Sequence, residues 1–404
     1  MNVALLKKSN LFRVLYTIKC SGPMTKPEIA TRTGLTSATV HTFVNELLGK
    51  NLLIEEGRNA SNGGRKAQIY RFNSRIKYVI GVYLALHSIT CCISDLDFDL
   101  KIEKIKPINL SEEDVQKNIH NLIDLINLSI AESGLSREDF AGIGIMVPGP
   151  ANRKKGIILK LVNAHKWVNI PLKNIVEESI GLPVIVDKDD YGIALHYKWV
   201  TLDSLRPNVV LISITDGIGS GLLINGDVFR GSHYVAGEVG HMSVDPRGSI
   251  CNCGNKGCLE LYSSNAGIVR RVIEHIMKEK VKSPLKALYA EKGSLDIEDV
   301  VRAAREKDSL AGRIFTEASL YIAIALGNVI KMFDPDEIVL NCYWLEELPE
   351  LFSTIVNHVY DNNHMVDRSD VKIRMNDIKQ LLIKGAVTLQ YNEIFGAYET
   401  CPFI

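Results

Sequence analysis

The feature that most restricts the fold of this 404-residue chain is a short run of metal-binding residue types within residues 237–260. It reads GEVGHMSVDPRGSICNCGNKGCLE and spaces its donors as H-x9-C-x-C-x4-C. His241, Cys251, Cys253 and Cys258 offer three thiolates and one imidazole, a complete tetrahedral set for which zinc is the usual ion. Because four protein ligands leave no open position, we expect a structural zinc ion.

The same cysteines could instead form a disulfide, or be unrelated buried thiols. Three cysteines within eight positions favour the metal, because the rest of the chain looks like that of a protein from a reducing compartment. We expect the remaining five, Cys20, Cys91, Cys92, Cys342 and Cys401, to be reduced.

Composition places the chain among soluble proteins of two or three domains. It is 46% apolar and 23% charged, and its apolar runs fall short of the roughly 20 residues needed to span a bilayer. The N-terminus, MNVALLKKSNLF, lacks the apolar core of a signal peptide. We therefore expect a cytoplasmic protein with no membrane partner.

The net charge of zero conceals an asymmetry along the chain. Residues 1–77 hold 13 Lys/Arg against 4 Asp/Glu, a balance of +9, so the remainder carries −9. A basic head on an acidic body indicates that the head meets a polyanion.

The basic head has the periodicity of a winged helix-turn-helix. Helices are predicted over 5–18, from Thr25 onward and over 36–50, with Gly34 in the turn between the last two. Strands at 52–54 and 69–72 flank a Gly- and Arg-rich connection, which predicts the wing. The recognition helix would lie in the major groove and the wing in a narrow minor groove. The predicted DNA contacts are Ser37, Thr39, His41, Thr42, Asn45, Gly64, Arg65 and Lys66. The alternative is a winged helix that contacts protein.

Two segments around the cysteine run resemble the signature of the ROK family, which groups sugar-responsive repressors with sugar kinases. An A-G-E-x-G-H segment stands at 236–241 and a C-x-C-G-x-x-G-C-x-E segment at 251–260. The wing's Gly-Gly-Arg and a Val-Pro-Gly-Pro turn at 147–150 are similar to the family's as well. The resemblance, closest to repressors of the xylose and N-acetylglucosamine type, covers nearly the whole chain.

The resemblance implies an α/β protein: an N-terminal winged helix-turn-helix followed by a two-lobed actin-like, ribonuclease-H-like body. We expect the DNA-binding domain at 1–74, the first lobe at 75–190 with a C-terminal segment at 381–404 packing back on it, and the second lobe with the zinc knuckle at 191–380.

The nucleotide motifs of the kinase branch are degraded in this chain. The family's Asp-x-Gly-Gly-Thr turn is matched by 83–87, Tyr-Leu-Ala-Leu-His, which has no carboxylate for Mg²⁺ and no glycine for phosphate. The second phosphate loop, 215–221, carries Asp216, and Asn341-Cys342 replaces a Gly-Gly pair. We therefore expect no enzyme activity, with Asp189 the vestige of the kinase base. The alternative is a ROK sugar kinase with an added DNA-binding head.

The positions that match the family's sugar-binding residues are better preserved than the nucleotide motifs. The resemblance implies ligand contacts from Lys188, Asp189, Glu238, His241 and Glu260, with Lys188 standing where the kinases have a sugar-binding asparagine. Carboxylates and imidazoles suit vicinal hydroxyls. Lys188 could neutralise Asp189 or meet an acidic or phosphorylated sugar.

Together these features predict a sugar-responsive transcriptional regulator, most simply a repressor of carbohydrate genes. We expect a homodimer or tetramer on an inverted-repeat operator in double-stranded DNA, with a sugar or sugar derivative held between the lobes and altering operator affinity. Regulation by a protein partner is a further possibility that the sequence leaves open.

Overall fold

The computed structural model describes residues 3–58, 67–201, 206–278, 282–362, 367–376 and 379–396. It has the predicted α/β class and separates into two compact units. Unit 1 comprises Met1–Met146, Pro171–Val186 and Ala386–Ile404, and unit 2 comprises Val147–Ile170 and Asp187–Gly385. The three-part division at residues 74 and 190 stays a prediction.

Unit 1 begins with three helices and a small antiparallel sheet of order β1-β3-β2. These elements are α1 (Val3–Ser21), β1 (Met24–Thr25), α2 (Lys26–Thr33), α3 (Ser37–Gly49), β2 (Leu53–Arg58) and β3 (Gln68–Phe72). Four apolar residues at helical spacing form the inward face of α1 and are at most 2% exposed: Leu11, Val14, Leu15 and Ile18. This arrangement is the winged helix-turn-helix. The predicted wing residues Gly64, Arg65 and Lys66 lie outside the described residues.

Local capping fixes the turn between α2 and α3. The Glu28 carboxylate accepts from the backbone N–H of Thr25 at 2.7 Å, which starts α2. Gly34 ends α2 in the left-handed conformation, with φ 68°, and its N–H donates to the Ala30 carbonyl. The Thr36 hydroxyl then accepts from Thr39 N–H and starts α3.

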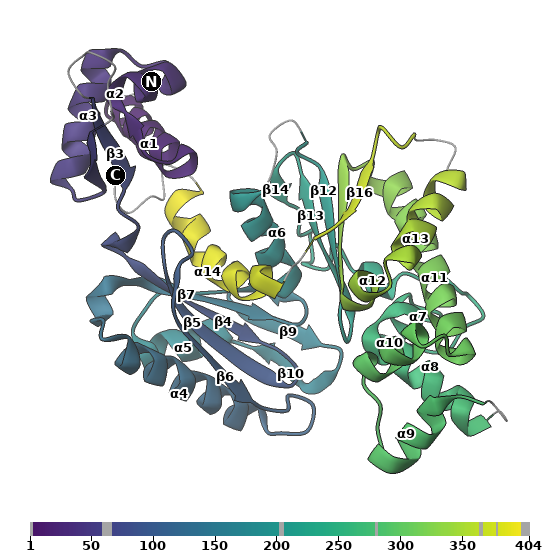
Figure 1. Ribbon diagram of the computed structural model, residues 1–404. Helices are drawn as coiled ribbons and strands as arrows, with labels where there is room; N and C mark the ends of the chain where they lie inside the picture. The colour runs from purple at the N-terminus through teal and green to yellow at the C-terminus, as the bar shows by residue number, and fades with distance from the viewer. Residues whose placement is uncertain are drawn as a thin grey trace. The chain divides into compact units, whose positions relative to one another are not determined.

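The rest of unit 1 is a mixed five-stranded sheet of order β11-β7-β4-β5-β6. Its elements are η1 (Ser74–Ile76), β4 (Tyr78–Leu84), β5 (Ser88–Asp95), β6 (Leu100–Pro107), α4 (Val115–Ser133), η2 (Arg137–Asp139), β7 (Phe140–Val147), α5 (Leu172–Ile180), β11 (Val184–Lys188) and, from Ala386 on, α14 (Lys379–Phe395). Strand β4 pairs antiparallel with β5 and parallel with β7. Helices α4 and α5 cover one face of the sheet, and α14 lies on the other (Figure 1).

Close packing of α14 on this sheet depends on glycine. A Cβ at Gly144 would stand 2.0 Å from the Ala386 carbonyl oxygen, and one at Gly81 would stand 2.8 Å from a Val387 methyl. Since no real Cβ tolerates such contacts, these two strand glycines allow the helix to approach the sheet backbone.

Unit 2 is built on a second five-stranded sheet, of order β14-β13-β12-β15-β16, and a small sheet of order β10-β9-β8. Its strands are β8 (Ala151–Asn152), β9 (Ile157–Leu161), β10 (Ala164–Ile170), β12 (Val209–Ile214), β13 (Ile218–Ile224), β14 (Asp227–Val228), β15 (Glu337–Cys342) and β16 (Lys372–Met375). Its helices are α6 (Asp189–Val200), η3 (Val239–His241), α7 (Glu260–Ser263), α8 (Asn265–Lys278), α9 (Pro284–Lys292), α10 (Ile297–Arg305), α11 (Ser309–Phe333), α12 (Tyr343–Glu347) and α13 (Pro349–Asp361).

The two faces of the central strand β12 serve two cores. Val210, Ile212 and Ile214 join the large cluster that includes α11, whereas Val209 and Leu211 pack with residues of α6. This alternation follows the two-residue period of a strand covered on both sides.

Helix α11 is also long and apolar enough to cross a membrane by length and composition, with a mean hydropathy of 1.3. Of that apolar window, 56% is buried in the unit. Helices in the core of a folded unit commonly meet the same criteria of length and hydropathy.

Candidate functional site

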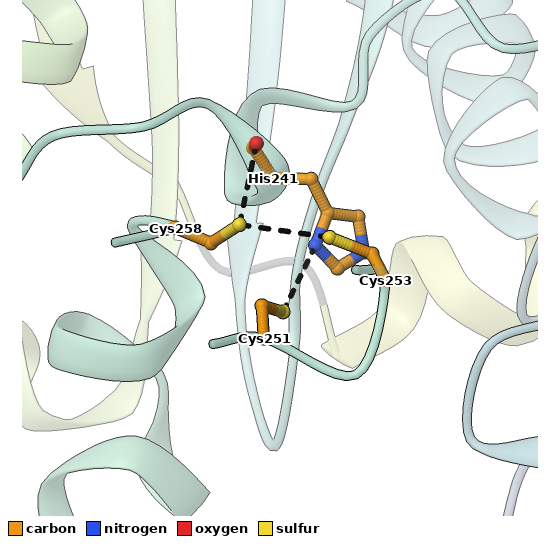
Figure 2. Close-up of side chains that lie close together, drawn as sticks. All are labelled: His241, Cys251, Cys253 and Cys258. Atoms are coloured by element: carbon orange, nitrogen blue, oxygen red, sulfur yellow. Dashed lines mark hydrogen bonds between the residues drawn. The ribbon is translucent and has the colours of Figure 1, made fainter. Parts of the chain in front are cut away.

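The four predicted metal ligands converge in unit 2. The ligand atoms of His241, Cys251, Cys253 and Cys258 all lie within 4.8 Å of one another. Figure 2 shows the four side chains pointing toward a common centre. The Cys253 and Cys258 sulfurs are 3.6 Å apart, and the Cys251 sulfur is 3.7 Å from His241 Nδ1. Usual zinc bond lengths on a tetrahedron give roughly 3.8 Å between two sulfurs and roughly 3.6 Å between sulfur and nitrogen. The residues therefore fit a zinc-sized tetrahedral ion.

The same distances separate a metal cluster from a disulfide. A disulfide requires about 2.05 Å between sulfurs, far below the 3.6 Å between Cys253 and Cys258. Burial raises the pKa of the Cys251 and Cys258 thiols, so both would hold their protons without a cation. Metal binding would release those protons.

A tight backbone loop brings these ligands together. The Cys251 N–H donates to the Asn255 carbonyl, and the Gly254 N–H donates back to the Cys251 carbonyl, both at 2.8 Å. Gly257 has φ 64°, and a Cβ there would meet the Asp245 carbonyl oxygen at 1.6 Å. Only glycine fits at this position.

Beside the cluster, Lys188 connects the start of α6 to the loop before η3. Its ammonium lies 2.7 Å from Glu238 Oε1 and 3.1 Å from Asp190 Oδ2, and the lysine side chain is 4% exposed. Burial alone would lower the pKa of Lys188, but the Asp190 and Glu238 carboxylates raise it above its ordinary value. Lys188 is therefore charged and held in place by two partners.

Asp189 is the predicted vestige of the kinase base, and its environment favours the protonated acid. Burial, followed by the neighbouring Asp190 carboxylate, raises the pKa of Asp189 to about 8. The backbone N–H of Asp190 donates to the Asp189 carboxylate at 2.9 Å. This shift favours the protonated acid, which can donate to a ligand oxygen.

The sequence did not predict the buried ion pairs that Asp187 forms next to Lys188. Asp187 is fully buried and accepts from Arg230 at 2.7 and 3.0 Å and from Arg153 at 3.2 Å. The Tyr191 ring lies under both Arg230 and Lys188, and its hydroxyl donates to the Ala236 carbonyl at 2.8 Å. The run Asp-Lys-Asp-Asp at 187–190 was the available signal, because buried carboxylates at a strand end need cationic partners.

The remaining predicted sugar contacts lie on or next to the loops that carry the predicted metal ligands. His241 Nε2 is 4.0 Å from Glu238 Oε2, so the imidazole presents Nδ1 to the sulfurs and its other nitrogen toward the carboxylate. Glu260, at the start of α7, accepts from the Ile218 N–H at 3.0 Å. Among the predicted sugar contacts, Lys188 and Glu238 touch each other, whereas Glu260 accepts a hydrogen bond from the backbone of β13.

The two loops that match nucleotide motifs use their backbone groups within the fold. At the β4–β5 turn, Ala85 N–H donates to the Ser88 carbonyl at 2.9 Å, and the carbonyls of Leu86 and His87 accept from the following chain. In the second loop, Cβ atoms at Gly219 and Gly221 would stand 2.3 and 2.4 Å from Asp190 atoms. These glycines therefore allow β13 to pack against α6, which accounts for them without a phosphate.

The predicted DNA-reading side chains lie along α3. Ser37, His41, Thr42 and Asn45 are exposed, and Thr39 is half-buried beside the capping hydroxyl of Thr36. The opposite face, including Val40, Val44 and Leu47, is buried in the head. The helix therefore offers a polar face free of core packing.

The fold and cluster define a winged helix-turn-helix joined to an actin-like α/β body with a His-Cys₃ knuckle. The profile of the ROK family matches residues 79–371. The chain belongs to the ROK family.

Relatives of nearly the same length are regulators. A xylose repressor from Caldicellulosiruptor bescii is 29% identical over 402 residues, covering 98% of both chains. A solved structure described as a ROK family transcriptional regulator, homologous to the E. coli MLC protein, has a TM-score of 0.79 and 27% identity, covering 95% of this chain and 96% of that one. A glucokinase from Halalkalibacterium halodurans is 35% identical over 221 residues, which is 54% of this chain and 66% of that enzyme.

Proposed function

We propose that this protein is a sugar-responsive transcriptional repressor of carbohydrate genes, acting in the cytoplasm. The observation that carries the proposal is the joining, in one chain, of a basic winged helix-turn-helix to a ROK body, matched end to end by a xylose repressor. The glucokinase match is confined to about half the chain.

The proposed DNA contacts are those predicted from the sequence. On α3 they are Ser37, Thr39, His41, Thr42 and Asn45, and on the wing Gly64, Arg65 and Lys66. Short polar side chains can bond base edges, and a basic wing suits the minor groove. We propose a homodimer or a tetramer bound to an inverted repeat, since two-fold symmetry in the protein matches a palindrome in DNA.

The proposed effector is a sugar or sugar derivative contacted by Lys188, Asp189, Glu238, His241 and Glu260. Support comes from the chemistry of the cluster, in which carboxylates accept from hydroxyls while Lys188 and a protonated Asp189 can donate. To bind at Glu238 Oε1, a sugar hydroxyl must share that oxygen with Lys188 at 2.7 Å or displace it.

Zinc is the metal proposed for His241, Cys251, Cys253 and Cys258. A bound zinc ion would supply a rigid crosslink and no reaction, because the donor set is closed. It would fix the loop that carries Glu238 on one side and α7 on the other. The donor set and spacing support zinc over harder ions, which prefer oxygen ligands.

The second candidate function is sugar phosphorylation, and the retained Asp189 favours it. Phosphoryl transfer depends on positioned Mg²⁺ and phosphates, for which the 83–87 turn offers neither carboxylate nor glycine. We therefore propose that the protein is not an enzyme. Incubation with ATP, Mg²⁺ and a panel of pentoses and hexoses tests this, and we expect no sugar phosphate to form.

The primary test is selection from a randomised duplex pool with the full-length, zinc-loaded protein, followed by binding measurements on the selected sequence. We expect an inverted repeat whose affinity falls steeply with salt, because Lys and Arg contacts release counterions. If no sequence is enriched, the proposed DNA-binding function is wrong.

A further inference from the structure

Lys26, the first residue of α2, forms a polar cluster with two side chains of α3. Its ammonium donates to Asn45 Oδ1 at 3.2 Å and lies 3.0 Å from His41 Nδ1. Asn45 Nδ2 lies 3.1 Å from His41 Nε2, which closes the ring of contacts. Sequence reasoning named His41 and Asn45 but not Lys26, because the lysine is 15 and 19 residues away on another helix.

The wing strands hold Lys26 in this position. Its ammonium stands 5.2 Å over the ring of Tyr70 on β3, and that tyrosine is 6% exposed. Burial lowers the pKa of Lys26, while the Glu55 carboxylate on β2 acts in the opposite direction. The lysine head is therefore oriented before any partner arrives, which reduces the entropy lost on binding.

The cluster has more donors than acceptors. An ammonium brings three donors, an amide two and a neutral imidazole one. Against them stand one amide oxygen and one unprotonated ring nitrogen, so the three side chains cannot satisfy each other. His41 and Asn45 are exposed, and the surplus donors are therefore open to an acceptor-rich partner.

We propose that Lys26, His41 and Asn45 form one preorganised unit that reads a guanine in the major groove, with Lys26 as a specificity-determining residue. Guanine presents two acceptors there, N7 and O6, whereas adenine presents a donor beside its N7. This inference rests on the proposed DNA-binding function and adds to it a residue on α2 and a preferred base.

The experiment uses the duplex selected by the wild-type, full-length, zinc-loaded protein. Each guanine of one half-site is replaced in turn by 7-deazaguanine, which removes the N7 acceptor and leaves base pairing intact. Affinities are measured for wild type, Lys26→Met, His41→Ala and Asn45→Ala. Lys7→Met is the matched control, since Lys7 is an exposed lysine of α1 paired with Glu46 and lies outside the cluster.

At one guanine we expect the 7-deaza change to weaken wild type and Lys7→Met by roughly five- to a hundredfold. Lys26→Met should bind the unmodified duplex correspondingly less well and respond to the 7-deaza change by no more than about twofold. Thermal unfolding of each variant reports folding. Lys26→Gln, which keeps an amide donor, serves if Lys26→Met does not fold.

The inference is overturned if every guanine substitution weakens Lys26→Met as much as wild type, or if the selected half-site contains no guanine. A uniform loss across unrelated duplexes would make Lys26 a phosphate contact only, which also overturns it. If wild type enriches no sequence at all, the proposed DNA-binding function fails first, and this inference fails with it.

Discussion

Lys188 stands where the resemblance to the sugar kinases implies an asparagine. Its ammonium contacts Asp190 and Glu238 and lies over the Tyr191 ring. A buried ammonium and a buried carboxylate are each costly alone and tolerable together. Lys188 and Asp190 therefore stabilise one another in their charged forms. Glu238 connects this pair to the loop that carries His241.

Metal binding can be tested at Cys253, the exposed member of the His-Cys₃ cluster. Cys253→Ser removes a thiolate while disturbing little core packing, so its effect reports the ion. We expect loss of zinc, measured by metal analysis, and a marked fall in the thermal midpoint of unit 2. Cys20→Ser, at another exposed thiol, is the control. A Cys253→Ser protein with one zinc per chain and wild-type stability would contradict the proposed metal site.

His196 should make the protein sensitive to mild acid. Burial, followed by the charge of Lys384, lowers the pKa of this α6 histidine to about 3, against 6.5 in an unfolded chain. The unfolded state therefore takes up a proton that the native state refuses, so this contribution to stability is present above pH 6.5 and is lost as pH falls toward 3. At pH 5 the loss is about 2 kcal/mol.

Urea unfolding at pH 7.5 and pH 5.0 measures this effect. Wild type should lose about 2 kcal/mol more between the two pH values than His196→Gln, whose side chain does not titrate. Equal losses in the two proteins would show that His196 is not responsible.

Secondary-structure elements were predictable where periodicity or capping is local. The apolar run at residues 209–214 predicts a strand, and β12 has these bounds. Its alternate apolar residues face two cores. The apolar periodicity of residues 110–131 predicts a helix from residue 110. Helix α4 begins instead at Val115, since the Asp114 carboxylate accepts from the backbone N–H groups of Gln116 and Lys117. The sequence of residues 184–190 predicts one strand. Strand β11 ends at Lys188 instead, and α6 begins at Asp189, because carboxylates are favoured in the first turn of a helix.

The packing of α14 on the unit 1 sheet gives a test at the level of elements. Gly144→Ala would place a methyl 2.0 Å from the Ala386 carbonyl, so we expect a destabilisation of about 1–3 kcal/mol. Gly312→Ala in α11 is the matched control, because nothing lies within 4 Å of its added Cβ. Helix propensity predicts a gain of about 0.5–1 kcal/mol there. Chemical denaturation compares the two, and an equal effect of both changes would contradict the packing account.

Much of the candidate site was predictable because the resemblance rests on short motifs. The four metal ligands lie within 18 residues, and spacing alone indicates their convergence. Asp187 with Arg153 and Arg230 was not predictable, since these partners are 34 and 43 residues apart and meet only through tertiary folding. The Lys26 cluster was missed for the same reason: periodicity reports which face a side chain shares, not which distant residue it contacts.

At the scale of the whole molecule, repression under sugar control requires two states with different affinities for the effector. A ligand shifts DNA binding only as far as it distinguishes those states, and typical couplings change affinity about 5- to 150-fold. The actin-like body holds the cluster proposed to bind the sugar. The β4–β5 turn uses its backbone groups within the fold, and the glycines of the second loop pack against Asp190. We therefore propose that sugar binding alone, without a nucleotide, changes the affinity for DNA.

The most direct test of this claim is the affinity of the full-length protein for its selected duplex, titrated with a panel of pentoses, hexoses and their phosphates in the absence of ATP. We predict that at least one sugar or sugar derivative changes that affinity by about fivefold or more without nucleotide. A change that appears only when ATP and Mg²⁺ are added, with formation of sugar phosphate, would contradict the account.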